Sequence, residues 1–490
     1  MTLRSVVSLG LVLVATPLSF VGCSNSNDKK PDGSYIVLDE GLVDVPAAKP
    51  DGKVATDGGL AQDAPVADAL IAPDRQDAQD AQDPQDAPIA QDAPASDGGV
   101  ADATLASDGL TGPCTEAVKF VGGEVTTSTT LTTACSPYTI SSTILVNGNA
   151  TLTIEPGVVL RFNPDTAIDI GRNSAGKLSA MGTATAPIVL TSANETPGAG
   201  DWTGVKLWGN TMNGTKLNYA VLDYCGAKDD ACLVGKDVKS NHVAIDHVTF
   251  SHVGTGANAI LETDTDSNFF ITNCTFNDIS NTPTQQFAIS VYAPSFAGID
   301  GNNLFNGEAM VELRGGYVTA DTTWQSLGTT VAVTSQLDIG GPTTPTLTIA
   351  AGSVFKFASG IAVSIGYADA GKLILAGTAN SPITFTSLAA TPKPSDWGGI
   401  ILWDDSSAKI AYATIAYAGS SKSSATGAVY LLANSDGLDI QNSTLAYSGS
   451  YGIGIPCGST ATLVNTSNTF TGNLSGNIGP GPDATGTACQ

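Results

Sequence analysis

The chain has 490 residues, which is enough for two or three ordinary domains or for one long repeat array. Its 46 acidic and 21 basic residues give a formal net charge of −25, which argues against a nucleic-acid partner because such a partner needs a basic face. Only 14% of residues are charged and 6% are aromatic, whereas glycine occurs 54 times, a composition suited to short strands and tight turns. Since no run of 18 or more residues is apolar, we expect no transmembrane span.

Residues 1–22 predict a secretory signal peptide, with a cation at Arg4 and an apolar stretch over residues 6–20. The segment ends in Phe20-Val21-Gly22-Cys23, which resembles the lipobox of bacterial lipoproteins, although leucine is more usual at the first of these positions. The resemblance implies that Cys23 is lipidated and anchors the protein to a membrane. By resemblance to Gram-negative lipoproteins, Ser24 implies the outer membrane rather than retention at the inner one. We expect the protein to be exposed at the cell surface. The alternative is an ordinary cleaved signal with an incidental cysteine.

Residues 23–112 predict a disordered, acidic tether. After Cys23 the segment holds 18 acidic and 5 basic residues, and it consists mainly of Asp, Ala, Pro, Gln and Gly. Such a segment buries too little apolar surface to offset the entropy lost on ordering. The alternative is a metal-binding or recognition tract, which evenly spaced single carboxylates suit poorly.

The remainder of the chain contains a duplication with an offset of 195 residues. The matched pairs include Leu152-Thr153-Ile154 with Leu347-Thr348-Ile349, Asp201-Trp202 with Asp396-Trp397, and Leu207-Trp208 with Leu402-Trp403. We therefore expect two copies of one module, over residues 113–320 with an N-terminal cap and over residues 321–490 with a C-terminal cap.

A shorter period lies within each module. Ile245-x-x-Val-x-Phe250 recurs 26 residues later as Ile271-x-x-Cys-x-Phe276, and alternating runs such as residues 151–154 and 188–190 indicate strands. A period near 25 with short strands and no helix between them predicts a solenoid in which each coil stacks its apolar residues on the next.

The sequence TLTIEPGVVLRF at residues 151–162 and its partner TLTIAAGSVFKF at residues 346–357 resemble the module of bacterial right-handed parallel β-helix proteins of the pectin-lyase-like superfamily. The motifs that follow, DWTGVKLW at residues 201–208 and DWGGIILW at residues 396–403, continue this resemblance. It implies an all-β, right-handed parallel β-helix of roughly 14 coils over residues 125–475.

Eight cysteines suit an oxidising compartment. With Cys23 assigned to lipid, proximity in the chain predicts three disulfides, and Cys274 is left as a buried free thiol. The predicted pairs are Cys114–Cys135, Cys225–Cys232 and Cys457–Cys489.

The three histidines are His242, His247 and His252. The Ile-Asp-His sequence at residues 245–247 resembles a coil of pectate and pectin lyases, which implies Asp223, Asp246 and His247 as site residues if the protein is a lyase. However, the arginine motif that supplies the base in those enzymes is absent. The adjacent carboxylates Asp229-Asp230 and Asp404-Asp405 lack the motifs that accompany a hydrolase pair. We therefore expect no catalytic residues.

Glu262, Asp264, Asp266 and Asn268 place four oxygen ligands at every second position, which makes this segment the best calcium candidate. It is not an EF-hand, and the alternative is an acidic turn between coils. No other cofactor is expected.

Four tryptophans form two matched pairs. Trp202 and Trp397 are predicted to shield the core, whereas alternation turns Trp208 and Trp403 outward. Outward rings beside Asn210, Asp404 and Asp405 would suit stacking on sugars, and the alternative is structural shielding. The sequence favours a monomeric, surface-anchored, non-catalytic protein that binds a cell-wall or extracellular polysaccharide or mediates adhesion. A polysaccharide lyase or glycoside hydrolase on the same fold is the first alternative, and a structural envelope protein with a protein partner is the second.

Overall fold

The computed structural model describes residues 114, 120–227, 231–238, 242–265, 267–277, 279, 287–419 and 427–481. The predicted signal peptide, the lipidation site Cys23 and the tether therefore lie outside the described residues, as do Asp229, Asp230 and Asp266. Within the described residues no helix is long and apolar enough to cross a membrane.

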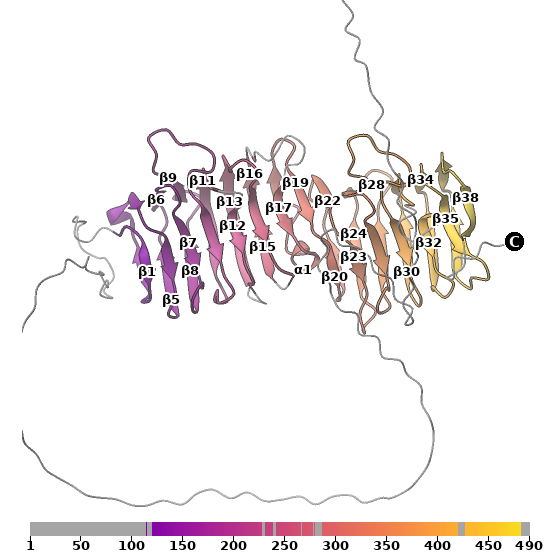
Figure 1. Cartoon of the computed structure of the whole chain (residues 1–490), viewed down its shortest axis with the longest axis horizontal. Coiled ribbons are helices and arrows are strands. Elements are labelled where there is room, and N and C mark those ends of the chain that lie inside the picture. The colour runs from indigo at the N-terminus through magenta and orange to yellow at the C-terminus, as the bar shows by residue number, and fades with distance from the viewer. Residues whose placement is uncertain are drawn as a thin grey trace, which may run out of the picture. The chain divides into compact units, whose positions relative to one another are not determined.

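The body of the chain is a parallel β-solenoid, which confirms the all-β fold predicted from the sequence. Its coils stack into a rod from the indigo β1 to the yellow β38 (Figure 1), and every pairing between strands is parallel. The only α-helix in the described part is the short α1 (Ala293–Phe296), and a 3-10 turn lies at Thr133–Cys135.

One sheet of 14 strands runs along the whole rod. Its strands are β1 (Gly123–Val125), β4 (Ile144–Val146), β7 (Ala167–Ile170), β10 (Gly204–Leu207), β12 (Ala231–Gly235), β14 (Asn258–Glu262), β17 (Phe287–Val291), β19 (Met310–Leu313), β22 (Thr330–Val333), β25 (Val354–Phe357), β28 (Ile383–Ser387), β31 (Ala413–Ala416), β34 (Thr444–Ala446) and β37 (Thr469–Thr471). The two modules therefore form one continuous rod.

The first module closes its coils with an 11-stranded sheet. Its strands are β2 (Thr129–Leu131), β3 (Tyr138–Ile140), β5 (Ala150–Ile154), β6 (Val159–Phe162), β8 (Gly176–Met181), β9 (Ile188–Ser192), β11 (Lys216–Asp223), β13 (His242–Ser251), β15 (Asn268–Thr272), β16 (Thr275–Phe276) and β18 (Leu304–Phe305).

From residue 316 onward, two separate sheets close the coils. The seven-stranded sheet holds β20 (Gly316–Val318), β23 (Leu337–Ile339), β26 (Ala362–Ile365), β29 (Gly399–Leu402), β32 (Gly427–Leu431), β35 (Tyr451–Pro456) and β38 (Gly476–Gly481). The six-stranded sheet holds β21 (Thr322–Trp324), β24 (Thr346–Ala350), β27 (Lys372–Ala376), β30 (Ser407–Ala411), β33 (Gly437–Gln441) and β36 (Thr462–Thr466).

The matched strands of the two modules lie on different faces of the rod. β6 belongs to the 11-stranded sheet, but β25, which lies 195 residues further on, belongs to the 14-stranded sheet. In the same way β7 belongs to the 14-stranded sheet and its counterpart β26 to the seven-stranded sheet. The duplication offset is therefore not a whole number of coils, and the second module is turned by one face relative to the first.

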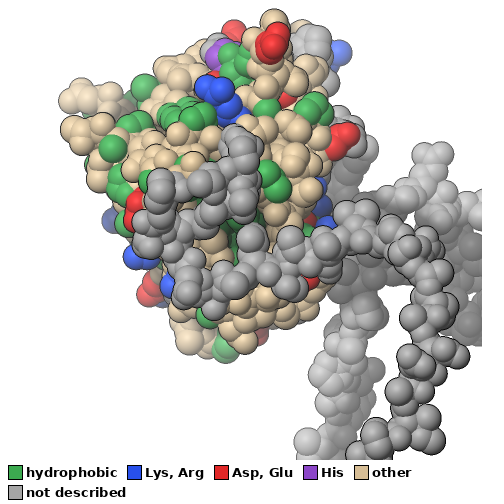
Figure 2. Space-filling view, turned by 90° about the vertical axis from the view of Figure 1, so that its left-hand side faces the viewer, with side chains coloured by type: hydrophobic (Ala, Val, Ile, Leu, Met, Phe, Trp, Pro, Cys, Tyr) green, Lys and Arg blue, Asp and Glu red, His purple; other side chains and the backbone are tan. Residues whose placement is uncertain are grey.

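Inward-facing residues of successive coils stack into one long core, as the period near 25 predicts. The Phe276 ring stacks on Phe250 with centroids 5.3 Å apart and on Phe305 with centroids 5.0 Å apart. At the N-terminal end, Phe120 is buried in the same core, and the Cys114–Cys135 disulfide ties Cys114 to the first coil. Figure 2 looks along the rod from this end, where apolar side chains are scattered among uncharged groups and a few side chains of either charge.

Candidate functional site

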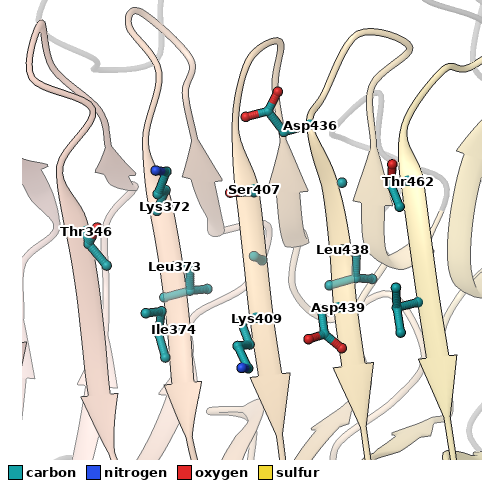
Figure 3. A pocket seen from close by; sticks show the side chains of 13 residues that line it. Thr346, Lys372, Leu373, Ile374, Ser407, Lys409, Asp436, Leu438, Asp439 and Thr462 are labelled. Atoms are coloured by element: carbon teal, nitrogen blue, oxygen red, sulfur yellow. The ribbon is translucent and has the colours of Figure 1, made fainter.

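A groove of about 390 Å³ lies on the outer face of the six-stranded sheet. It crosses five neighbouring strands from β24 to β36, so it runs along the rod rather than along one strand (Figure 3). At a strand spacing of roughly 4.8 Å, five strands form a track about 19 Å long. The lining residues outside the core are Thr346, Lys372, Ile374, Ser407, Lys409, Asp436, Gly437, Asp439, Thr462 and Val464.

Strand register places these groups in two columns. Thr346, Lys372, Ser407 and Thr462 occupy one column, with Gly437 between the last two. Because Gly437 has a φ of 138° and a Cβ there would collide with the Thr462 carbonyl oxygen, the column has no side chain at this point. The missing side chain contributes to the hollow.

The second column carries Ile374, Lys409, Asp439 and Val464 in register. Lys372 and Lys409 are exposed, and among the described residues neither forms an ion pair. The groove thus combines ammonium, carboxylate and hydroxyl groups with apolar side chains such as Ile374 and Val464, a combination that suits a hydroxyl-rich ligand.

Trp403 and its neighbours lie in the turn that leads into the groove. Asp404 and Asp405 follow Trp403 and precede Ser407, which lines the groove. Asp404 Oδ2 accepts a hydrogen bond from Asn434 Nδ2 at 3.4 Å. Trp403 is half-buried after β29, with the edge of the Tyr367 ring against it at a centroid distance of 4.9 Å.

Trp208, the counterpart of Trp403, lies on a different face of the rod. It follows β10 of the 14-stranded sheet, whereas β29 belongs to the seven-stranded sheet. The Arg172 guanidinium and the Lys236 ammonium lie 5.2 and 5.1 Å from the centroid of its ring. Structural shielding by Trp208 and Trp403 and stacking of these rings on sugars both remain predictions.

The lyase-like residues divide between two corners of the first module. His247 Nδ1 lies 2.9 Å from Asp246 Oδ2, and its ring stacks on Tyr219 at 4.3 Å. His247 and Tyr219 both have a left-handed backbone conformation, with φ of 53° and 44°, and this conformation turns each strand sharply at that residue. Asp223 instead bonds to His252 Nδ1 at 2.7 Å. The structure therefore pairs Asp246 with His247 and pairs Asp223 with His252.

Hydrogen bonds hold Asp246 in its ionised form. Burial alone would raise its pKa, but donors from Asn273, His247 and Thr272 outweigh this effect and lower the pKa of Asp246 below its ordinary value. A carboxylate so engaged is a weak proton acceptor, which does not suit a general base. Only the backbone of His242 is described.

The family comparison agrees with this architecture. The model of the pectate-lyase-like beta helix domain matches residues 123–236 and 316–433. The body of the chain is a pectate-lyase-like β-helix. The domain model thus matches the chain twice, which agrees with the repeat found in the sequence.

One curated protein resembles part of the chain. Protein bark beetle of Drosophila melanogaster is 38% identical over 99 residues, which is 20% of this chain and 3% of that protein. The chain therefore spans only a small fraction of the length of this relative. No solved structure gives a significant match.

The calcium candidates of the β-helix have other partners in the structure. Glu262 is buried and accepts hydrogen bonds from the Tyr292 amide at 2.8 Å and from the Ser295 hydroxyl at 2.7 Å. Asp264 accepts from the Ser267 hydroxyl, and Asn268 begins β15. Among the described residues no three His, Cys, Asp or Glu side chains form a group suited to a metal ion. The calcium site stays a prediction.

The cysteine predictions are confirmed within the described residues. Cys114 bonds to Cys135 and Cys225 bonds to Cys232. Cys457 is disulfide-bonded as well, and its expected partner Cys489 lies outside the described residues. The free thiol of Cys274 is buried, and burial raises its pKa to about 12, which leaves it unreactive.

Sequence reasoning missed the groove residues Lys372, Lys409, Asp436 and Asp439. The available signal was strand alternation, which places Lys372 and Lys409 opposite the core residues Leu373 and Ile410. Their alignment across coils carried no signal, because the loops between the strands differ in length.

Proposed function

We propose that this β-helix binds an extended polysaccharide along the groove of the six-stranded sheet and does not cleave it. The observation that carries the proposal is the alignment of the groove across five coils, because a repetitive ligand can make similar contacts at each coil. Lys372 and Lys409 would contact carboxylate or hydroxyl oxygens, and Thr346, Ser407 and Thr462 would bond to further hydroxyls.

A binding role agrees better with the geometry than the lyase or hydrolase alternative does. Those reactions need a positioned base, or an acid and a base on either side of one bond. Asp223 and Asp246 are each engaged by a histidine at separate corners, and neither lines the groove. The proposal retains the anchor at Cys23 and the acidic tether, which would hold the groove away from the membrane.

Binding of the full chain to soluble neutral and acidic polysaccharides tests the proposal. The double variant Lys372→Ala/Lys409→Ala should raise the Kd of the bound polysaccharide about tenfold, or roughly 1.4 kcal/mol. The first module provides a matched control, the double variant Lys177→Ala/Lys216→Ala. Lys177 lies 195 residues before Lys372. Lys216 pairs with Ser179 in the same way that Lys409 pairs with Ile374.

The control variant should bind as tightly as the parent chain. Failure of every polysaccharide to bind would contradict the proposal. Equal binding by both double variants would mean that the polysaccharide does not bind in the groove. Loss of binding in Trp403→Ala alone would assign the binding site to the seven-stranded sheet.

A further inference from the structure

The groove of the six-stranded sheet carries charges of both signs, and these charges are separated along the rod. Among its described lining residues the cations are Lys372 and Lys409, which lie on the neighbouring strands β27 and β30. The carboxylates are Asp436, directly before β33, and Asp439, within β33, which is the next strand along the rod. Figure 3 shows the four side chains on these three successive strands. The groove therefore has a cationic half and an anionic half.

The two halves do not neutralise each other within the protein. Lys409 and Asp439 are in register on neighbouring strands and both are described, yet no ion pair joins them. Lys372, Lys409 and Asp436 are exposed, and Asp439 is half-buried. Each half can therefore contact a ligand group of the opposite charge.

The coil can form without the acidic residue of β33. In the first module Lys216 occupies the position of Lys409, and the residue in register with it on the next strand is Ala244. In the second module Asp439 holds that position. Because β11 pairs with β13 as β30 pairs with β33, strand pairing does not require the Asp439 carboxylate. This carboxylate can therefore serve a contact outside the protein.

We propose that the groove selects a polysaccharide that carries both carboxylate and amino groups. The carboxylates bind Lys372 and Lys409, and the protonated amines bind Asp436 and Asp439, through charge-assisted hydrogen bonds. A polymer with carboxylates alone would place some of them beside the two aspartates, and a polymer with amines alone would place some beside the two lysines. Like charges at such short range lower affinity, so only the mixed polymer gains in both halves.

The strand spacing fixes how far apart the two kinds of ligand group lie. β27 and β33 are two strand spacings apart, and β30 and β33 are one, so the groups lie roughly 5–10 Å apart along the polymer. The carboxylate and the amine therefore belong to the same sugar or to neighbouring sugars. This specificity rests on the function proposed above.

Four polymers with the same glycosidic linkage test the specificity. Hydroxyethyl cellulose is neutral, carboxymethyl cellulose carries carboxylates, chitosan carries amines, and carboxymethyl chitosan carries both. Titration calorimetry of the full chain at about pH 5.5 keeps carboxylates ionised and amines protonated. We expect carboxymethyl chitosan to have a Kd at least tenfold lower than that of carboxymethyl cellulose.

Two variants separate the halves of the groove. Asp436→Asn/Asp439→Asn should raise the Kd of carboxymethyl chitosan about tenfold and should not weaken carboxymethyl cellulose. The matched control is Asp237→Asn/Glu308→Gln, which also removes two exposed carboxylates, both in the first module, and should bind every polymer as the parent chain does. Since the acidic tether adds the same attraction for amines to every variant, differences between variants report the groove.

The cationic half gives the opposite pattern. Lys372→Gln/Lys409→Gln should weaken both carboxymethylated polymers about tenfold and should not weaken chitosan. Carboxymethyl chitosan that binds no more tightly than carboxymethyl cellulose, or an aspartate double variant that behaves like its control, would overturn the specificity and leave the groove as a polysaccharide site. Failure of all four polymers to bind would overturn the specificity together with the proposed function.

Discussion

Trp208 and Trp403 occupy matching positions of the two modules, yet their surroundings on the outer surface differ. Around Trp208 the module places cations, with Arg172 and Lys236 over the ring. The matching positions around Trp403 hold Tyr367 and Leu432. Tyr367 lies 195 residues after Arg172. Leu432 directly follows β32, which pairs with β29, just as Lys236 directly follows β12, which pairs with β10. The first surface is cationic and the second is aromatic and aliphatic.

The core beneath these surfaces is nearly the same in both modules. Trp202 stacks on Phe162 at 4.0 Å, and Trp397 stacks on Phe357 at 4.1 Å, with an interplanar angle of 9° in each pair. Each indole Nε1 donates to a backbone carbonyl at 2.8 Å. Inward positions are constrained by packing against both neighbouring coils, whereas outward positions contact solvent. The difference between the modules therefore lies mainly on the surface, where ligands bind.

The largest expected effect tests whether the two cores are equivalent. Trp202→Ala and Trp397→Ala should each lower the free energy of unfolding by about 3–5 kcal/mol, because each removes a fully buried indole. The two losses should agree within about 1 kcal/mol in urea denaturation, since contacts and burial match. A loss below about 1 kcal/mol for only one variant would show that the modules differ in stability as well as in surface.

A smaller effect arises where the cores differ. By strand register Glu262 occupies the inward position that Ile455 holds in the second module. Burial raises the pKa of Glu262 to about 7 from an ordinary 4.5. The folded chain therefore keeps a proton that the unfolded chain releases between these pH values. Stability should fall by about 3 kcal/mol as pH rises from 4.5 to above 7.

The substitution Glu262→Gln should remove this pH dependence, because the amide oxygen can still accept from the Tyr292 amide while the charge is gone. Urea denaturation at pH 5 and pH 8 measures the effect, and the exposed Glu308→Gln serves as a control that should keep the slope of the parent chain. A Glu262→Gln variant with the same slope as the parent would assign the pH dependence to other groups.

Local sequence patterns predicted most of the fold. Alternation depends on neighbouring residues within a strand, and the period near 25 depends on similar motifs in successive coils. Two of the predicted disulfides, Cys114–Cys135 and Cys225–Cys232, join residues close in the chain. The groove depends instead on register between coils. Lys372 pairs with Ser407 after 35 residues, Ser407 with Gly437 after 30 and Gly437 with Thr462 after 25. Because loop lengths vary in this way, no fixed period predicts which side chains become neighbours.

The smallest expected effect returns to the two outer tryptophans. Arg172→Gln removes a cation from the Trp208 ring and an ion pair of 3.2 Å with the buried Asp169, whereas Tyr367→Gln removes an edge contact with Trp403. Each substitution should lower the free energy of unfolding by roughly 0.5–1 kcal/mol. The loss for Arg172→Gln is small because Arg172 is half exposed. At 1 M NaCl the cost of Arg172→Gln should shrink because salt screens charges, whereas that of Tyr367→Gln should not. Urea midpoints at 0.05 M and 1 M NaCl measure both, and an equal salt response would mean that charge does not distinguish the two surfaces.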